Sequence, residues 1–298
     1  MNKKFVLGID IGGSHITGGL IDLANTRYIQ NTQVRKKVNP HASSEEIIAV
    51  WASTVTDVAD SHPNSFYNIG IAMPGPFDYE NGICLIKGFN KYEALYEMDI
   101  RQLLSKKLHI TGERIRFKND AAAFLEGEVF CGAAKGFTNA IGITLGTGLG
   151  SAISKDGVTI DAELSVLPYK GDKIEEAVST RGLVKTYNQL SGKTAENVKE
   201  IADKVKTDEN AVKAFKIFSD ALSWFLYEFI QRENPDIVVL GGNITLSWDL
   251  FMLDVISNLS KVLVKVPKIE RAILGEAALL IGGACCFKME SAVLQAGS

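Results

Sequence analysis

The feature that most constrains the fold of this chain is a β-rich run that leads into a glycine turn, because the pattern occurs twice. In the first copy, residues 5–10 lead into a glycine pair and residues 16–23 follow as a second β-rich run. In the second copy, 134 positions later, residues 140–145 lead into Gly146-Thr147-Gly148 and residues 151–154 return. Two β-rich runs around glycines predict a hairpin. We therefore expect two similarly built halves.

Between these hairpins, apolar residues recur at helical spacing and alternate with further β-rich runs. One amphipathic helix opens at Ser43, three residues before Glu46, which is the spacing of a capping box. Trp51 falls on the apolar side of this helix. Strands that alternate with helices, with a hairpin inside each half, predict a two-domain α/β protein with mixed β-sheets. Other strands are expected near residues 28–34, 68–76, 114–120 and 236–240, and other helices near 97–108, 121–129, 211–232 and 275–287.

Composition excludes several classes of protein. The 298 residues are 46% apolar and carry a formal net charge of −3, so no strongly basic face for nucleic acid is indicated. No run of about 18 or more apolar residues is present, so we expect no membrane span. The amino terminus lacks the features of a secretory signal. The four cysteines show no metal-ligand or disulfide spacing. Free thiols in a reducing cytosol are the expected state, which predicts a cytoplasmic protein.

Glycine-rich turns at strand ends are candidate phosphate-binding sites. Glycine lets the backbone turn sharply and lets its N–H groups approach an anion closely. None of these turns has the lysine of a P-loop, and the first two return as strands, unlike a Rossmann turn. A tight hairpin needs glycine whether or not phosphate is present, so one turn alone is weak support. The turns are Asp10-Ile11-Gly12-Gly13-Ser14, Gly146-Thr147-Gly148-Leu149-Gly150 and Gly241-Gly242-Asn243, and together with Asp10, Thr144 and Thr147 they favour a phosphate site.

Two aspartates stand where phosphoryl transfer would need them, and each has a structural alternative. Asp10 follows an apolar strand, so its carboxylate could hold Mg²⁺ through water beside a polyphosphate; alternatively it caps its own turn. Asp120, preceded by Asn119, suits a general base that takes the proton of an attacking hydroxyl. Alternatively, Asp120 caps the alanine-rich helix that follows. The local pattern favours neither of these two roles over the other. His15 is a phosphate contact or a tolerated hairpin residue.

With these motifs in this order, the chain resembles the ROK (repressor, open reading frame, kinase) sugar kinases over nearly its full length. The resemblance implies an actin-like ATPase (ribonuclease H-like) fold with mixed β-sheets and an interdomain cleft. It implies a small N-terminal domain at residues 1–118 plus a C-terminal helix at about 285–298, and a larger nucleotide-binding domain at 119–284. The matching segments are 8–14, 70–78, 119–123, 143–150, 240–244 and 276–279.

The resemblance implies an ATP-dependent hexose or N-acetylhexosamine kinase that phosphorylates a sugar hydroxyl, expected at O6. Asp120 would be the general base, and Asp10 would hold Mg²⁺ through water. The other matching residues would bind the two substrates. The residues expected to bind the sugar are Asn90, Asn119, Glu163 and Glu175, with Gly75 at a niche for an acetamido group. The residues expected to bind the phosphates of the donor are Gly12, Gly13, Ser14, Thr144, Gly146, Thr147 and Gly148, and those expected at its adenosine are Gly241 and Gly242.

The chain departs from the family pattern in three places. Many family members bind zinc through a histidine and a cysteine-rich segment, but Val166 stands at the histidine position and the cysteines are missing. We therefore predict no zinc site. Loss of that histidine leaves the preference for sugar hydroxyls and anomers open, and Glu176 is an alternative to Glu175 at the sugar. His15 replaces the family's lysine after the first glycine pair.

Two other functions are alternatives. Relatives without zinc include enzymes that use inorganic polyphosphate and share the Asp-x-Gly-Gly-Ser turn, although Gly241-Gly242 looks like an adenosine-side turn and favours ATP. The second alternative is a sugar-binding regulator without turnover, against which Asp10, Asn119 and Asp120 argue. Repressors of the family carry a helix-turn-helix domain ahead of the kinase core, whereas this chain starts directly with the first strand. The resemblance also implies a homodimer with no nucleic-acid or membrane partner.

Overall fold

The structure is a computed structural model that describes residues 5–62 and 67–288. It divides into two compact units: residues 136–275 form the second, and the chain before and after them forms the first. This division differs from the sequence boundaries at 118/119 and 284/285. The difference arises because α3 (Asp120–Cys131) and α9 (Ala277–Ala284) pack on each other within the first unit. Residues 289–298 of the expected C-terminal helix lie outside the described residues.

The first unit is built on a mixed sheet with the strand order β3-β2-β1-β5-β8, and β4 also pairs with β2. β1 and β2 form the predicted hairpin, and β5 runs parallel to β1 on its other side. The strand expected at 28–34 is instead two short strands, β3 and β4, each paired with β2. The strands are β1 (Val6–Ile11), β2 (His15–Asp22), β3 (Arg27–Tyr28), β4 (Val34–Lys37), β5 (Asn68–Met73), β6 (Phe77–Asp78), β7 (Ile83–Cys84) and β8 (Ile115–Asn119).

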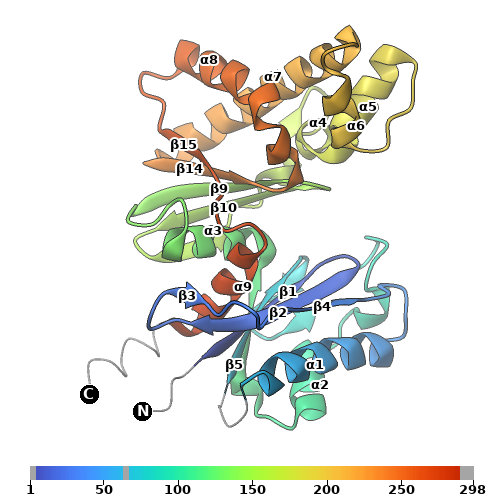
Figure 1. Cartoon of the computed structure of the whole chain (residues 1–298), viewed down its shortest axis with the longest axis vertical. Helices are drawn as coiled ribbons and strands as arrows, with labels where there is room; N and C mark the ends of the chain where they lie inside the picture. Colours follow the sequence, from blue (N-terminus) through green and yellow to red (C-terminus); the bar gives the residue numbers. More distant parts are fainter. Residues whose placement is uncertain (1–4, 63–66, 289–298) are drawn as a thin grey trace. The chain divides into compact units, whose positions relative to one another are not determined.

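Helices cover both faces of this sheet (Figure 1). α1 (Ser44–Asp60) lies on one face with α2 (Ile100–Leu108) beside it, and Trp51 of α1 is 1% exposed in the apolar core. α1 opens with the predicted capping box between Ser43 and Glu46. α2 begins later than expected, because Asp99 caps it by accepting a hydrogen bond from the N–H of Gln102. Two short 3₁₀ turns, η1 (Glu93–Leu95) and η2 (Gly112–Arg114), flank α2 in the chain.

The other face of the sheet is covered by α9, which approaches it very closely. A Cβ atom on Gly8 of β1 would lie 2.0 Å from the carbonyl oxygen of Leu280. A Cβ atom on Gly282 of α9 would in turn lie 1.7 Å from the carbonyl oxygen of Ala123 in α3. Because no side chain fits at such distances, glycine at both positions lets the sheet, α9 and α3 stack as three layers. The start of α3, at Asp120, lies near the end of β1 because α3 directly follows β8, and β1, β5 and β8 run parallel and end at the same edge of the sheet.

The second unit repeats the arrangement of the first. Its sheet has the order β11-β10-β9-β14-β15, in which β9 and β10 form a hairpin and β14 runs parallel to β9. The first sheet has the same succession of a hairpin and then parallel strands. The two similarly built halves expected from the repeated motif are therefore confirmed. The strands are β9 (Asn139–Leu145), β10 (Leu149–Lys155), β11 (Val158–Asp161), β12 (Pro168–Tyr169), β13 (Asp172–Lys173), β14 (Ile237–Gly241) and β15 (Lys268–Arg271).

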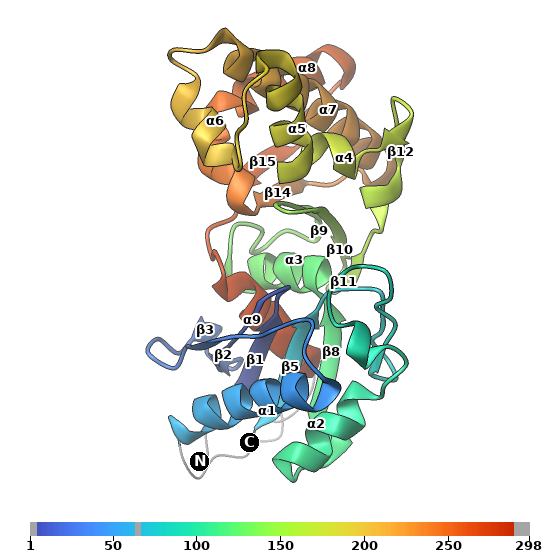
Figure 2. The ribbon, with the colours of Figure 1, turned by 90° about the vertical axis from the view of Figure 1, so that its right-hand side faces the viewer.

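Helices gather over one face of the second sheet (Figure 2). The longest predicted helix is confirmed as α7 (Glu209–Glu233), which ends at a left-handed Asn234 just before Pro235. Within the described ranges, no helix is both long and apolar enough to cross a membrane. The remaining helices are α4 (Glu175–Val178), α5 (Thr180–Ser191), α6 (Val198–Lys204) and α8 (Met252–Val262), and the short 3₁₀ segments are η3 (Leu164–Val166) and η4 (Asn243–Leu250), with η5 (Cys285–Phe287) following α9 in the first unit.

Candidate active site

The first glycine turn joins β1 to β2, and two hydrogen bonds of Gly12 hold it, one within the hairpin and one from a distant segment of the chain. The N–H of Gly12 donates to the carbonyl of His15 (2.9 Å), which closes the hairpin. The hydroxyl of Tyr92, from a distant part of the chain, donates to the carbonyl of Gly12 (2.6 Å). The imidazole of His15 lies over Gly12, where a Cβ atom would come within 2.9 Å of the ring. Gly13 and Ser14 are exposed, so the turn presents its backbone outward, as a phosphate-binding turn must.

The two aspartates singled out from the sequence lie close enough for the charge of Asp120 to affect the ionisation of Asp10. Asp10 is the penultimate residue of β1, and Asp120 is the first residue of α3. Burial is the main cause that raises the pKa of Asp10 from 3.8 to about 7. The negative charges of Asp120 and then Glu276 contribute to this rise, and the positive charge of Arg35 opposes it. Burial also raises the pKa of Asp120, while the N–H of Ala121 and the positive charge of Lys91 oppose this rise. Two carboxyl groups of elevated pKa therefore meet beside the first turn.

The surroundings of Asp10 fit a hydrated cation. Thr17 pairs with Asp10 across the hairpin, so the two side chains share one face of the sheet. Thr17 is 2% exposed, and its hydroxyl has no hydrogen-bond partner in the described part of the chain. Arg35 of β4 pairs with Thr17 on the other side of β2 and donates to both carboxylate oxygens of Glu276 (2.7 Å each). One carboxylate beside an unused hydroxyl suits Mg²⁺, which keeps several of its waters. Among residues 5–62 and 67–288, no cluster of three or more metal-ligating side chains occurs.

Asn119 ends β8 and caps α3. Its Oδ1 accepts a hydrogen bond from the N–H of Ala122 (3.1 Å), and its Nδ2 donates to the hydroxyl of Tyr79 (3.2 Å). The same hydroxyl would lie 3.3 Å from a Cβ atom on Gly75. Asn119 rather than Asp120 is therefore the cap of this helix, and the carboxylate of Asp120 accepts a hydrogen bond from the N–H of Ala121 (2.8 Å). The structure thus brings Gly75, Tyr79 and Asn119 together, and Tyr79 was not singled out from the sequence.

Asn90 lies in a loop whose shape is set by one carboxylate. The N–H groups of Gly88, Phe89 and Asn90 all donate to Oε1 of Glu93, at 2.8, 3.0 and 3.2 Å. Asn90 is exposed and has a left-handed backbone with a φ of 55°. The charge of the next residue, Lys91, acts on Asp120. The loop therefore brings Lys91, the neighbour of Asn90 in the chain, close enough to Asp120 to affect its ionisation.

The second glycine turn, between β9 and β10, is held by a carboxylate. The N–H of Leu149 donates to Oε2 of Glu175 (2.9 Å). A Cβ atom on Gly148 would lie 2.6 Å from that oxygen, so a larger residue there would displace the carboxylate. The N–H of Thr180, at the start of α5, donates to the carbonyl of Gly146 (2.8 Å). The turn is thus fixed by α4 and α5, while Thr147 at its tip is exposed.

The glutamates expected at the sugar have different surroundings. Arg181 donates to Oε1 of Glu175 (2.9 Å) and to Oε1 of Glu176 (2.6 Å), so Glu175 contacts the glycine turn with one oxygen and Arg181 with the other. Glu163 is exposed just before η3 and has a left-handed backbone with a φ of 53°. Val166, at the end of η3, is 58% exposed. The structure joins Glu175 to the second glycine turn, a contact that was not predicted from the sequence, and Arg181 was not singled out from the sequence either.

The third glycine turn follows β14 at the same edge of the sheet as the second. Gly241 pairs with Thr144 of the parallel strand β9, so the ends of the two strands lie side by side. Gly242 has a φ of 89°, and a Cβ atom there would lie 2.3 Å from the carbonyl oxygen of Leu145. Both facts require glycine at this position. Thr144 and two of the predicted glycine turns therefore meet at the carboxyl edge of one sheet, where open α/β sheets bind their ligands.

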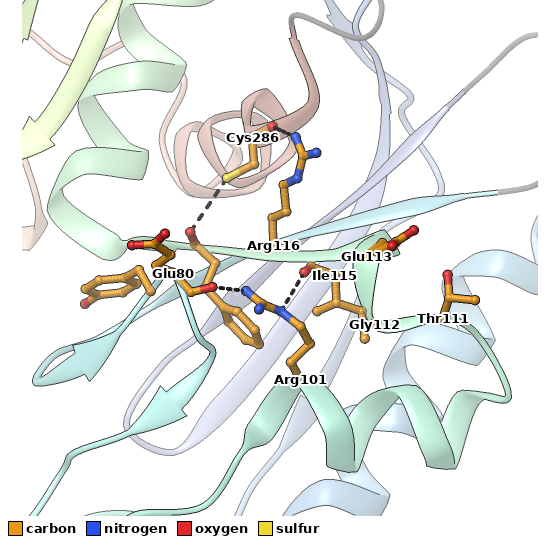
Figure 3. A pocket seen from close by; sticks show the side chains of 10 residues that line it. Glu80, Arg101, Thr111, Gly112, Glu113, Ile115, Arg116 and Cys286 are labelled. Atoms are coloured by element: carbon orange, nitrogen blue, oxygen red, sulfur yellow. Dashed lines mark hydrogen bonds between the residues drawn. The ribbon is translucent and has the colours of Figure 1, made fainter.

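A cleft of about 790 Å³ opens beside β8 in the first unit (Figure 3). Arg101 extends along it and donates from Nε to the carbonyl of Ile115 (3.2 Å) and from a terminal nitrogen to the carbonyl of Glu80 (2.6 Å). The cleft shares Tyr79 with the hydrogen bonds of Asn119, but none of the predicted site residues lines it. Its lining is Tyr79, Glu80, Arg101, Thr111, Gly112, Glu113, Ile115, Arg116, Phe117 and Cys286.

Comparisons with known proteins identify the fold. The model of the ROK family matches residues 6–289. A glucokinase of Thermotoga maritima is 26% identical over 279 residues, covering 82% of this chain and 84% of the relative. An N-acetyl-D-glucosamine kinase of Pectobacterium atrosepticum is 23% identical over 317 residues, covering 95% of this chain and 99% of the relative. A crystal structure of a ROK family glucokinase from Streptomyces griseus with glucose and AMPPNP matches with a TM-score of 0.76 at 21% identity, covering 95% of this chain and 98% of that one. The predicted actin-like α/β fold with mixed sheets is confirmed.

Proposed function

The chain belongs to the ROK family, and on that premise we propose that it phosphorylates a hexose or an N-acetylhexosamine with ATP, at O6 of the sugar. Two similar proteins are a glucokinase and an N-acetyl-D-glucosamine kinase. A protein of similar fold was crystallised with glucose and AMPPNP, which is an ATP analogue. Sugar and nucleoside triphosphate are therefore the substrate classes that the comparisons support.

The observation that carries this proposal is the proximity of Asp10 and Asp120 beside the first glycine turn. The two carboxyl groups come from different elements, the end of β1 and the start of α3, and the negative charge of Asp120 raises the pKa of Asp10. Phosphoryl transfer needs one group that takes a proton and another that holds the cation of the donor. This pair supplies both within one unit of the fold.

Asp120 would take the proton of the attacking sugar hydroxyl. Its elevated pKa makes the ionised carboxylate a stronger base, while Lys91 favours that ionised form. The hydrogen bond from the N–H of Ala121 orients the carboxylate at the start of α3. A base placed in this way contributes about 10²- to 10⁴-fold to the rate.

Asp10 and the hydroxyl of Thr17 would hold Mg²⁺ through water, and the ion would neutralise charge on the donor phosphates. The glycine turns would add backbone N–H groups to the phosphates. For the donor we propose Gly12, Gly13, Ser14, Thr144, Gly146, Thr147 and Gly148 at the phosphates and Gly241 and Gly242 at adenosine. For the sugar we propose Asn90, Asn119, Glu163, Glu175 and the niche at Gly75.

ATP is preferred to inorganic polyphosphate as the donor, because the third glycine turn lies at the same sheet edge as the second and offers a place for the nucleoside. Turnover with polyphosphate in nucleotide-free buffer would instead establish polyphosphate as a donor. A regulator that binds sugar without turnover is the other alternative. As the family resemblance implies, we also propose a cytoplasmic homodimer, which light scattering and cell fractionation would test.

The test of the function is a panel of sugars with ATP and Mg²⁺, scored by kcat/KM from ADP release. Glucose, N-acetylglucosamine, N-acetylmannosamine, mannose and fructose form the panel. Asp120→Asn should lose turnover by about 10²-fold or more while sugar binding is kept. Asp99→Asn is the matched control, because Asp99 also stands at a helix start but caps α2. Substantial activity in Asp120→Asn would contradict its role as base, and sugar binding without turnover in the unaltered protein would favour the regulator.

A further inference from the structure

Tyr92 connects two parts of the first unit that the proposed function uses separately. It is completely buried, and its ring packs edge-on against Trp51 with the ring centres 5.4 Å apart. Its backbone is left-handed, with a φ of 55°, and its N–H donates to the carbonyl of Pro40 (2.8 Å). Tyr92 is therefore anchored by core packing and by its backbone, so the direction of its hydroxyl is set by the fold.

That hydroxyl determines the orientation of one peptide group in the first glycine turn. It donates to the carbonyl of Gly12 at 2.6 Å. In a trans peptide the C=O of one residue and the N–H of the next point in opposite directions. Holding the carbonyl of Gly12 inward therefore turns the N–H of Gly13 outward. The space around Gly13 is open, since a Cβ atom there would meet nothing within 4 Å.

The same residue belongs to the loop that carries Asn90. Glu93, one position after Tyr92, gathers the N–H groups of residues 88–90 on a single carboxylate oxygen. Tyr92 therefore joins this loop, through its hydroxyl, to the peptide between Gly12 and Gly13. Burial raises the pKa of Tyr92 above its ordinary value, so its hydroxyl remains a donor over the working pH range.

We propose that Tyr92 is a positioning residue that couples the sugar loop, residues 88–93, to the phosphate-binding turn at Gly12 and Gly13. This inference rests on the proposed function, because it assigns the loop to the sugar and the turn to the donor. Its hydroxyl sets the Gly13 N–H for the donor phosphate and transmits the position of the loop to the turn. The second unit contains a comparable brace, in which the carboxylate of Glu175 holds the N–H of Leu149 in the corresponding hairpin.

The first test is Tyr92→Phe, which removes the hydroxyl and leaves the ring in place. The carbonyl of Gly12 then loses its donor, so KM for ATP should rise about tenfold. The KM for sugar should stay within about twofold of the unaltered protein. Tyr187→Phe is the matched control, because Tyr187 is equally buried and its hydroxyl donates to Asp208 (3.1 Å) in the second unit. The control should leave both KM values unchanged.

A double-mutant cycle separates coupling from a loss of structure. Glu93→Ala releases the loop without touching the glycine turn, so it should raise KM for sugar. Coupling through Tyr92 predicts that Glu93→Ala also raises KM for ATP, and that this second effect disappears when Tyr92→Phe is already present. Additive effects on KM for ATP, or a KM for ATP unchanged in Tyr92→Phe, would overturn the proposal. The cycle compares Glu93→Ala with and without the hydroxyl, so a general loss of stability does not imitate it.

Direct binding distinguishes failure of this inference from failure of the proposed function. Calorimetry with Mg²⁺–AMPPNP, and with inorganic polyphosphate as a second probe, measures donor affinity without turnover. Weaker donor binding in Tyr92→Phe but not in Tyr187→Phe would support the inference even if no sugar of the panel is phosphorylated. Equal donor binding in both variants would overturn it even if the unaltered protein is an active kinase. If neither probe bound to the unaltered protein, both this inference and the proposed function would be overturned.

Discussion

Replacing Asp10 by asparagine should make the first unit more stable above neutral pH while it removes activity. Folding raises the pKa of Asp10 from 3.8 to about 7, chiefly through burial and then through the charges of Asp120 and Glu276. Between these two values the folded protein keeps a proton that the unfolded chain has released. The free energy of unfolding therefore falls as the pH rises through this window. Asparagine carries no charge at any pH and avoids this loss.

The size of the effect follows from the two pKa values. The difference between 3.8 and about 7 corresponds to about 4 kcal/mol of unfolding free energy at a pH well above both. This is an upper limit for the gain, because the asparagine amide must also be buried and find partners. Below the lower pKa the gain should vanish, since the aspartate is then neutral in both states. Activity should be lost at every pH if Asp10 holds the cation.

The assay is urea unfolding without divalent cations at about pH 3, 6 and 8, a range that spans both pKa values. Fluorescence of Trp51 reports on the first unit when Trp224 and Trp248, both in the second unit, are replaced by phenylalanine. The stability difference between Asp10→Asn and the unaltered protein should grow with pH. A difference that is independent of pH, or a variant that is less stable at the highest pH, would refute the reasoning.

Asp22→Asn is the matched control, with an expected effect of opposite sign. Burial would raise the pKa of Asp22, but hydrogen bonds from Asn25 and Arg27 outweigh it and lower the pKa below 3.8. Such a carboxylate stabilises the folded state above its unfolded pKa, and this contribution is lost as the pH falls through the folded pKa. Asp22→Asn should therefore be less stable than the unaltered protein at neutral pH, and the deficit should shrink in acid.

Three further predictions concern a helix cap, a helix contact and the second turn. Ser43→Ala removes the capping box of α1 and should cost about 1 kcal/mol in urea unfolding. Gly282→Ala forces a methyl group against the backbone of α3 and should cost about 3 kcal/mol or more, whereas Gly112→Ala, which meets only the flexible side chain of Arg101 at 3.4 Å, should cost far less. Glu175→Ala should raise KM for ATP about tenfold because the N–H of Leu149 loses its acceptor, while Glu176→Ala, which removes a contact with Arg181 alone among the bonds described, should change it little.

Local pattern alone determined much of the architecture. A β-rich run, a glycine turn and a returning run specify a hairpin by residue type and spacing, so both hairpins and their repetition in the two halves were predicted. The capping box of α1 and the length of α7 follow from short-range rules in the same way. Aspartates at strand ends drew attention to positions 10 and 120, because polar residues after apolar strands are local signals. Each of these features depends on residues close together in the chain.

Contacts between distant segments were decided by the tertiary structure alone. The sequence does not show that the hydroxyl of Tyr92 meets the carbonyl of Gly12, because 80 positions separate them. It also does not show that Glu175 holds the second turn, since the same carboxylate could equally face a sugar. The parallel pairing of β1, β5 and β8 brings Asp120 to Asp10, and the stacking of α3 on α9 through Gly282 moves the unit boundary to residue 136. Periodicity and turn chemistry encode the direction of a chain over a few residues, whereas these contacts depend on how whole layers pack.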